Sequence, residues 1–163
     1  MDIKTEKAIF ASGCFWGTEY FMKKHPAVIS TCVGYIGGEK ENPTYDEVCS
    51  GTTKHAEAVE VVFNTEKYDF EDVAKLFFET HDFTQIGGVG PDIGNQYRSE
   101  IFYLSNEQKE ISENLIKTLE EKGYKVSTRI TKATKFWKAE GNHQDYYYKT
   151  GGNPYCHIYK KIF

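Results

Sequence analysis

The stretch from residue 7 to residue 24, KAIFASGCFWGTEYFMKK, combines two hydrophobic patterns. Residues 7–12 form a short apolar run that ends at Gly13, which is typical of a buried strand. Residues 15–24 have the composition of a helix. The stretch therefore predicts a strand, a tight turn and a helix, with Cys14 in the turn near the helix N-terminus.

Strand and helix patterns follow one another along the rest of the chain, without an internal repeat or a linker. We expect strands over residues 28–36, 55–63, 98–104 and 125–131, helices over residues 70–81, between Ser105 and Gly123 and over residues 140–149, and a helical turn at residues 45–49. Asp69 and Ser105 are the expected N-caps of two of these helices.

Helices separate most of the strands, but the second and third strands meet across a loop. This order predicts an α+β fold: a two-layer sandwich with a mixed central sheet, close to the ferredoxin-like or split βαβ arrangement. We expect residues 1–163 to form a single domain, with a long irregular C-terminal tail that starts at Gly151.

The composition argues against two classes of partner. Hydrophobic residues make up 39% of the 163 positions, charged residues 27%, and the formal net charge is -4. An acidic chain is poorly suited to bind nucleic acid or an anionic membrane surface. No apolar run approaches the length of a membrane span, and the charged residues 1–7 do not resemble a signal peptide, so a cytoplasmic protein is expected.

The chain has four cysteines, at Cys14, Cys32, Cys49 and Cys156. No pair has CxxC or zinc-ligand spacing, so we expect neither a metal site nor a cofactor. In a reducing compartment these residues would rest as thiols, and any disulfide among them would be transient and catalytic. Cys32 and Cys49 are expected to be structural.

Local chemistry leaves two interpretations of Cys14 open. A cysteine beside two aromatic residues is often a buried core thiol. A helix N-terminus, however, favours the thiolate, and the thiolate is the nucleophilic form of cysteine. Under this second interpretation the sulfur is open to a ligand, and Phe15 and Trp16 form two walls of an apolar slot beside it.

Residues 13–17 (GCFWG) resemble the signature of the peptide methionine sulfoxide reductase A family. The resemblance extends from about Ala8 to Cys156. Further short motifs follow in the family's order: GY at 34–35, GG at 37–38, NPTY at 42–45, VCSG at 48–51, HAEAV at 55–59, HD at 81–82, QYRS at 96–99 and HQ at 143–144.

This resemblance implies reduction of the S epimer of methionine sulfoxide, free or in proteins, to methionine. The Cys14 thiolate would attack the sulfoxide sulfur and become a sulfenic acid that thiols recycle. Phe15 and Trp16 would hold the S-methyl group, because an aromatic slot accepts it without a polar contact.

Glu57 is the expected proton donor. It lies in a mostly apolar strand, where burial would raise its pKa and keep it protonated near neutrality. Alternation places Glu57, Val59 and Val61 on one face of that strand, and the two valines indicate that this face is buried.

The resemblance also implies roles for several loop residues. Tyr45 and Tyr97 match the tyrosines whose hydroxyls bind the sulfoxide oxygen. Asp92 matches a carboxylate that helps to fix the substrate or a water, although an aspartate after a proline is also typical of a turn. For His55 and His143 we expect supporting or structural roles.

Cys156 is the candidate resolving cysteine. It lies in the irregular tail, which suits a thiol that must reach Cys14. Tyr155 and Cys156 could instead dock the tail as buried residues. Oxidised protein or free methionine sulfoxide is the expected substrate, thioredoxin or another thiol the expected reductant, and a monomer the expected state.

The chain departs from the family pattern in one region. Residues 81–84 read HDFT where the family usually has Asp-Pro-Thr-Gln after the histidine, and the loop over residues 86–92 differs as well. We expect this loop to border the pocket.

The sequence also leaves two other functions open: a cysteine hydrolase with His55 or His143 as base, and a non-catalytic module whose aromatic patch binds a peptide methionine.

Overall fold

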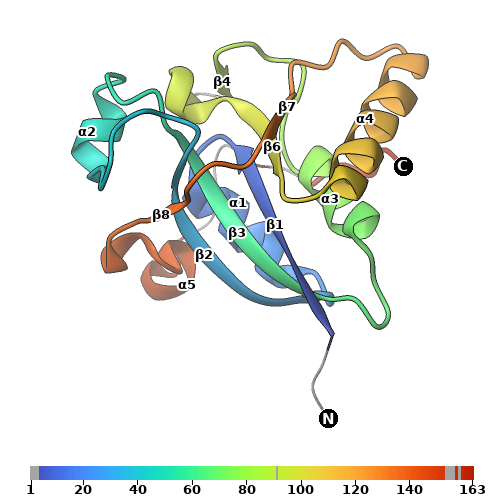
Figure 1. Ribbon diagram of the computed structural model, residues 1–163, viewed down its shortest axis with the longest axis horizontal. Helices are drawn as coiled ribbons and strands as arrows, with labels where there is room; N and C mark the ends of the chain where they lie inside the picture. Colours follow the sequence, from blue (N-terminus) through green and yellow to red (C-terminus); the bar gives the residue numbers. More distant parts are fainter. Residues whose placement is uncertain (1–3, 91, 153–156, 158) are drawn as a thin grey trace.

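A six-stranded mixed sheet lies at the centre of the protein, with helices packed along it (Figure 1). The computed structural model describes residues 4–90, 92–152, 157 and 159–163. The strands are β1 (Thr5–Ser12), β2 (Val28–Ile36), β3 (Ala56–Asn64), β4 (Gly88–Val89), β5 (Asp92–Ile93), β6 (Ser99–Tyr103), β7 (Arg129–Lys132) and β8 (Trp137–Lys138). The helices are α1 (Phe15–Lys24), α2 (Tyr45–Cys49), α3 (Phe70–Glu79), α4 (Asn106–Glu121) and α5 (Tyr146–Thr150).

The strand order, β7-β6-β1-β3-β2-β8, contains a split βαβ unit. Helix α1 connects β1 to β2, and β3 lies between these two strands and is antiparallel to both. Helix α3 connects β3 to β6, which pairs antiparallel with β1 on its other side. Among the strand pairs that the described residues form in this sheet, β6–β7 alone is parallel. The predicted α+β fold with a mixed central sheet is confirmed.

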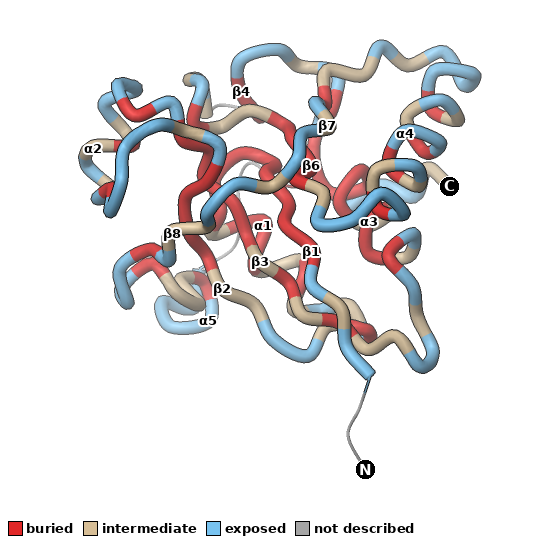
Figure 2. Tube along the Cα trace, viewed as in Figure 1, coloured by how far each residue is buried: buried red, intermediate tan, exposed pale blue. Residues whose placement is uncertain are grey.

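The central strands are buried on both faces (Figure 2). Because side chains alternate along a strand, Ala8 and Phe10 of β1 join the core under the helices, whereas Ile9 and Ala11 join a smaller cluster on the other face. Phe10 stacks on the rings of Phe70 and Phe77 at 5.8 and 5.2 Å. This packing ties α3 to the strand that leads into Cys14.

Most predicted elements are observed close to their expected bounds, and their N-caps explain why. Asp69 accepts a hydrogen bond from the backbone N–H of Asp72 and forms a full capping box at α3. Ser105 caps α4 through the backbone N–H of Gln108. The side chain of Gln108 does not complete a capping box, because its carbonyl accepts a hydrogen bond from the backbone N–H of Leu104.

Two predicted elements differ from the structure. The strand expected over residues 125–131 begins only at Arg129, because the backbone N–H of Ser127 binds the carbonyl of Phe83 instead of a strand. The helix expected over residues 140–149 is broken by Asp145, whose φ of 55° lies in the left-handed region. A 3-10 turn at Gly141–His143 and the short helix α5 take its place.

Within the described ranges, no helix has both the length and the apolar content that crossing a membrane requires. Cys156, the predicted resolving cysteine, lies outside the described residues.

Candidate active site

Cys14 lies between β1 and α1, as predicted, and is the N-cap residue of α1. The turn requires glycine at position 13 for two reasons. Gly13 has a φ of 87°, which a side chain disfavours, and a Cβ there would lie 2.7 Å from the Cβ of Val89. The loop that carries β4 therefore packs directly on the cysteine turn, and the expectation that residues 86–92 border the site agrees with this contact.

The Cys14 residue is only 4% exposed, so it is less open to a ligand than expected. Phe15, the first residue of α1, is fully buried. Burial alone would favour the neutral thiol, but the positive end of the helix dipole favours negative charge at this position.

Glu57 is fully buried on the helix-facing side of β3, where Tyr35 of β2 lies opposite it in the register. Its Oε1 atom accepts a hydrogen bond from the backbone N–H of Phe15 at 3.3 Å. Its Oε2 atom is buried and has no hydrogen-bond partner among the described residues. A buried acceptor without a donor is costly for a carboxylate and is relieved when the group carries a proton or meets a ligand.

The pKa of Glu57 is raised to about 8: burial is the main cause, the hydrogen bond from the Phe15 N–H opposes it, and the nearby Asp92 makes a smaller contribution in the same direction as burial. At neutral pH the carboxyl group is therefore mostly protonated. It can then donate a proton to a bound ligand, and it adds no negative charge beside the Cys14 sulfur.

Aromatic rings surround the first turn of α1. Trp16 stacks on Tyr146 with 3.9 Å between ring centroids and on Tyr45 at 6.2 Å. Phe15 stacks on Tyr45 at 6.1 Å, so Tyr45 contacts both of the predicted slot residues. Tyr146 was not singled out from the sequence, because it is one of twelve tyrosines and lies far from residue 16 along the chain.

His143 holds the Trp16 ring in place. Its Nδ1 atom accepts a hydrogen bond from the Trp16 indole at 3.2 Å, and its ring lies 4.3 Å from that of Tyr45. Burial lowers the pKa of His143, which keeps the ring neutral and able to accept this bond. The expected supporting role of His143 agrees with this position.

The segment that carries His143 is tied to the strands and to α2 by two side chains. Glu140 accepts hydrogen bonds from the Tyr35 hydroxyl and from the Tyr45 backbone N–H, each at 3.1 Å. Gln144 pairs with the backbone N–H and carbonyl of Val33, each at 2.9 Å. These contacts explain the HQ pair: the histidine orients the tryptophan, and the glutamine fixes the segment to β2.

The hydroxyl groups of Tyr45 and Tyr97 converge near Glu57. Burial raises the pKa of each tyrosine, and the Glu57 carboxyl adds to both shifts. Both hydroxyls remain protonated and can donate hydrogen bonds to one acceptor. The structure thus brings together two residues that are far apart in the sequence, in agreement with the predicted oxygen site.

Cys49 also belongs to this cluster, which the sequence did not indicate. Its sulfur interacts with the hydroxyls of Tyr45 and Tyr97, and burial raises the pKa of its thiol. Tyr45 and Cys49 are four positions apart on α2, so they share one helix face. This spacing is the one feature of the sequence that links Cys49 to the site. It places Cys49 there only once Tyr45 is known to belong to the site.

Asp92 begins β5 and lies close enough to Glu57, Tyr97 and His157 to affect the pKa of each. The charge interaction with Asp92 adds to burial, the larger cause, in raising the pKa of Glu57. Cys14, Glu57 and Asp92 each lie close enough to Tyr97 to affect its pKa, so these four residues lie together in the fold. Among the described residues, no group of three or more metal-ligating side chains is assembled there or elsewhere.

His55 and His143 are poorly suited to act as a general base. The Nδ1 atom of His55 accepts from the Gly38 backbone N–H at 3.0 Å, and its Nε2 atom lies 2.7 Å from the Lys40 carbonyl. A neutral imidazole has one acceptor nitrogen, and in both histidines that nitrogen already accepts a hydrogen bond. This geometry disfavours the cysteine hydrolase.

Comparisons with known proteins agree with the geometry of the site. The sequence profile of a family described as peptide methionine sulfoxide reductase matches residues 6–163. A peptide methionine sulfoxide reductase MsrA from Methanothermobacter thermautotrophicus is 46% identical over 144 residues, which cover 86% of this chain and 85% of the relative.

Two solved structures are similar over most of the chain. Reduced Mxr1 from Saccharomyces cerevisiae aligns with a TM-score of 0.90 and 32% identity, covering 96% of this chain and 93% of the yeast chain. Methionine sulfoxide reductase A of Corynebacterium diphtheriae aligns with a TM-score of 0.80 and 34% identity, covering 90% and 76%.

Proposed function

The chain belongs to the peptide methionine sulfoxide reductase family, and on this basis we propose that it reduces the S epimer of methionine sulfoxide to methionine. The observation that carries the proposal is the contact between Glu57 and the cysteine turn. A buried, protonated carboxyl group is fixed to the backbone of the residue that follows a cysteine at a helix N-terminus. This arrangement combines a sulfur nucleophile with an acid that serves a leaving oxygen.

In the proposed reaction, the Cys14 sulfur attacks the sulfoxide sulfur while Glu57 protonates the sulfoxide oxygen. The S–O bond of the substrate breaks, and the oxygen is transferred to Cys14. The products are methionine and a Cys14 sulfenic acid, so the substrate sulfur is reduced by two electrons and the cysteine sulfur is oxidised by two. The proton that Glu57 gives to the oxygen ends on the sulfenic acid, and the proton that the Cys14 thiol releases on becoming the nucleophile restores Glu57, so the step is balanced without another reactant.

The other residues of the cluster bind and orient the substrate. Tyr45 and Tyr97 donate hydrogen bonds to the sulfoxide oxygen, where negative charge is greatest before proton transfer. Phe15 and Trp16 contact the S-methyl group, and His143 fixes the Trp16 ring. The pyramidal sulfoxide sulfur is a stereocentre. Contacts that fix both its oxygen and its methyl group therefore accept one epimer only.

Recycling would use the tail cysteine. The thiol of Cys156 attacks the Cys14 sulfenic acid, which forms a disulfide and releases water. A dithiol of the thioredoxin class then reduces the disulfide to two thiols and is itself oxidised to a disulfide. This scheme requires a reducing compartment, which supports the expected cytoplasmic location. A monomer is sufficient, because one chain supplies every group named.

The test follows each epimer of a diastereomeric methionine sulfoxide peptide with dithiothreitol as reductant. We expect consumption of the S epimer alone by the wild-type protein, and complete loss of turnover in Cys14→Ser. Cys32→Ser is the matched control, because Cys32 is a half-buried thiol on β2 outside the cluster. Turnover by Cys14→Ser at the wild-type rate would disprove the mechanism, and binding without turnover by the wild type would favour the non-catalytic module.

A further inference from the structure

His157 links the C-terminal tail to the cysteine turn. It is 2% exposed, and its Nε2 atom lies 2.5 Å from the backbone carbonyl of Ser12 and 3.3 Å from the hydroxyl of Thr18. Ser12 precedes the Gly13–Cys14 turn, and Thr18 lies in the first turn of α1. A single imidazole from the far end of the chain therefore contacts the backbone on one side of Cys14 and the helix on the other.

The Gly17 position is shaped by this imidazole. A Cβ at residue 17 would overlap the Nδ1 atom of His157 and would lie 2.8 Å from its Cε1 atom. The ring also lies 6.5 Å from that of Phe21, one helical turn further along α1. The second glycine of the GCFWG stretch therefore leaves room for a tail residue behind the active site.

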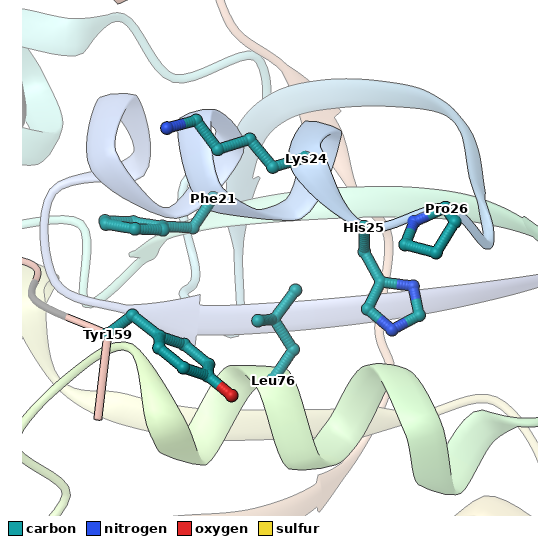
Figure 3. Close-up of a pocket in the computed structure, with 6 residues that line it drawn as sticks. All are labelled: Phe21, Lys24, His25, Pro26, Leu76 and Tyr159. Atoms are coloured by element: carbon teal, nitrogen blue, oxygen red, sulfur yellow. The ribbon is translucent and has the colours of Figure 1, made fainter. Parts of the chain in front are cut away.

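Further along the tail, Tyr159 lies near both α1 and α3 (Figure 3). Tyr159 approaches Phe21 of α1 and Leu76 of α3 and closes one side of a pocket of about 300 Å³. Further on, Glu79 of α3 accepts from the backbone N–H of Ile162 at 2.7 Å, and its carbonyl accepts from that of Lys160 at 2.8 Å. The described tail residues are thus fixed at both α1 and α3.

The charge state of His157 is consistent with these contacts. Burial lowers the pKa of His157 to about 4, and the Ser12 carbonyl and Asp92 only partly oppose this shift. The ring is therefore neutral at physiological pH. With its proton on Nε2, it donates to the Ser12 carbonyl and leaves the unprotonated Nδ1 atom facing Gly17.

The residue before His157 in the chain is Cys156. We propose that His157 is a positioning residue for recycling: its contacts with Ser12, Gly17 and Thr18 keep the tail thiol within reach of the oxidised Cys14. The proposal rests on the recycling route given above, in which Cys156 attacks the sulfenic acid, a disulfide forms and water leaves. His157 itself exchanges no proton or electron in this step.

An anchor of this kind predicts a specific kinetic effect. Forming methionine needs only the substrate cluster, whereas forming the disulfide needs the tail thiol at high effective concentration. Loss of the anchor should leave the first step intact and slow the second. If His157 had a purely structural role, its loss would lower the rates of both steps.

The experiment mixes the reduced protein with one equivalent of the S epimer, without reductant. Methionine formation is followed by chromatography, the sulfenic acid by dimedone trapping and the disulfide by mass spectrometry of quenched samples. The variants are His157→Ala, His157→Gln, which retains an N–H donor for the Ser12 carbonyl, and Cys156→Ser.

We expect His157→Ala to form one equivalent of methionine at close to the wild-type rate but to form the disulfide at least about tenfold more slowly. His157→Gln should recover most of the disulfide rate. Disulfide formation by His157→Ala at the wild-type rate would overturn the proposal, as would an equal loss in both steps for His157→Ala and His157→Gln.

Cys156→Ser separates failure of the anchor from failure of the recycling route. If the route is correct, this variant forms methionine normally and retains the sulfenic acid. If Cys156→Ser instead loses its sulfenic acid as fast as the wild type and turns over equally well with thioredoxin, the route is wrong and the anchor fails with it.

Discussion

Glu57 of β3 and Phe15 of α1 are joined by a hydrogen bond of 3.3 Å from the Phe15 backbone N–H to the carboxyl group. The two residues are 42 positions apart in the chain, and the bond forms only because β3 lies beside the strand that leads into α1. It fixes the proposed proton donor relative to the backbone that carries Cys14. The geometry of the reaction therefore depends on the sheet more than on any flexible side chain.

The activity of Glu57→Gln tests the acid role. The amide keeps the size of the side chain but has no acidic proton, so we expect kcat to fall by about 10²–10⁴. The wild-type rate should also fall above about pH 8, where Glu57 loses its proton. Initial rates between pH 6 and 10 check both points, and a wild-type profile that stays flat to pH 10 would contradict the assignment.

The same variant should also show a weaker dependence of its stability on pH than the wild type. The native state keeps the Glu57 proton to about pH 8, whereas the unfolded chain releases it near the ordinary pKa of 4.5. The free energy of unfolding should therefore fall as the pH rises through this window, by at most about 1.4 kcal/mol per unit. Urea unfolding at pH 5 and pH 8 should show a smaller fall for Glu57→Gln than for the wild type; equal falls would argue against a protonated native carboxyl.

The Trp16–His143 hydrogen bond should affect substrate binding more than chemistry. His143→Phe keeps an aromatic ring against Tyr45 and Phe15 but removes the acceptor of the indole N–H. A lost hydrogen bond costs about 1 kcal/mol, so KM should rise about fivefold with kcat little changed. Steady-state kinetics measure KM and kcat separately. Trp16→Phe, which removes the donor, should raise KM by a similar factor, and the double variant should raise it little further.

Gly17→Ala should change the stability of the protein in opposite directions in the wild type and in His157→Ala. Alanine normally stabilises a helix by about 1 kcal/mol relative to glycine, but in the wild type its methyl group meets the His157 ring. We expect destabilisation in the wild type and stabilisation in His157→Ala, where the ring is absent. Thermal unfolding of the four proteins gives the coupling energy, and additive effects would show that the two residues do not share a contact.

Local sequence patterns were sufficient for the elements that frame the site. The apolar run before Gly13 and the capping residues Asp69 and Ser105 led to strands and helices that the structure confirms. The alternation around Glu57 correctly placed it on the buried face shared with Val59 and Val61. These features depend on residues that are close in the chain, so periodicity and capping reveal them.

Other features depend on contacts between distant segments, which local patterns do not show. Asp145 broke the last predicted helix because its backbone N–H binds Glu19 of α1 in a left-handed turn. Cys49 and Tyr146 belong to the cluster only because α2 and α5 fold against α1. The near-complete burial of Cys14 likewise follows from packing that no short window contains.

By itself, the sequence determined the order of strands and helices, the cysteine turn and the carboxyl group that faces it. Only the tertiary structure decided that His157 lies behind this turn, because that contact joins residues 145 positions apart. Its physical basis is the burial of a neutral imidazole against Gly17, and burial of this kind is settled when the whole chain packs.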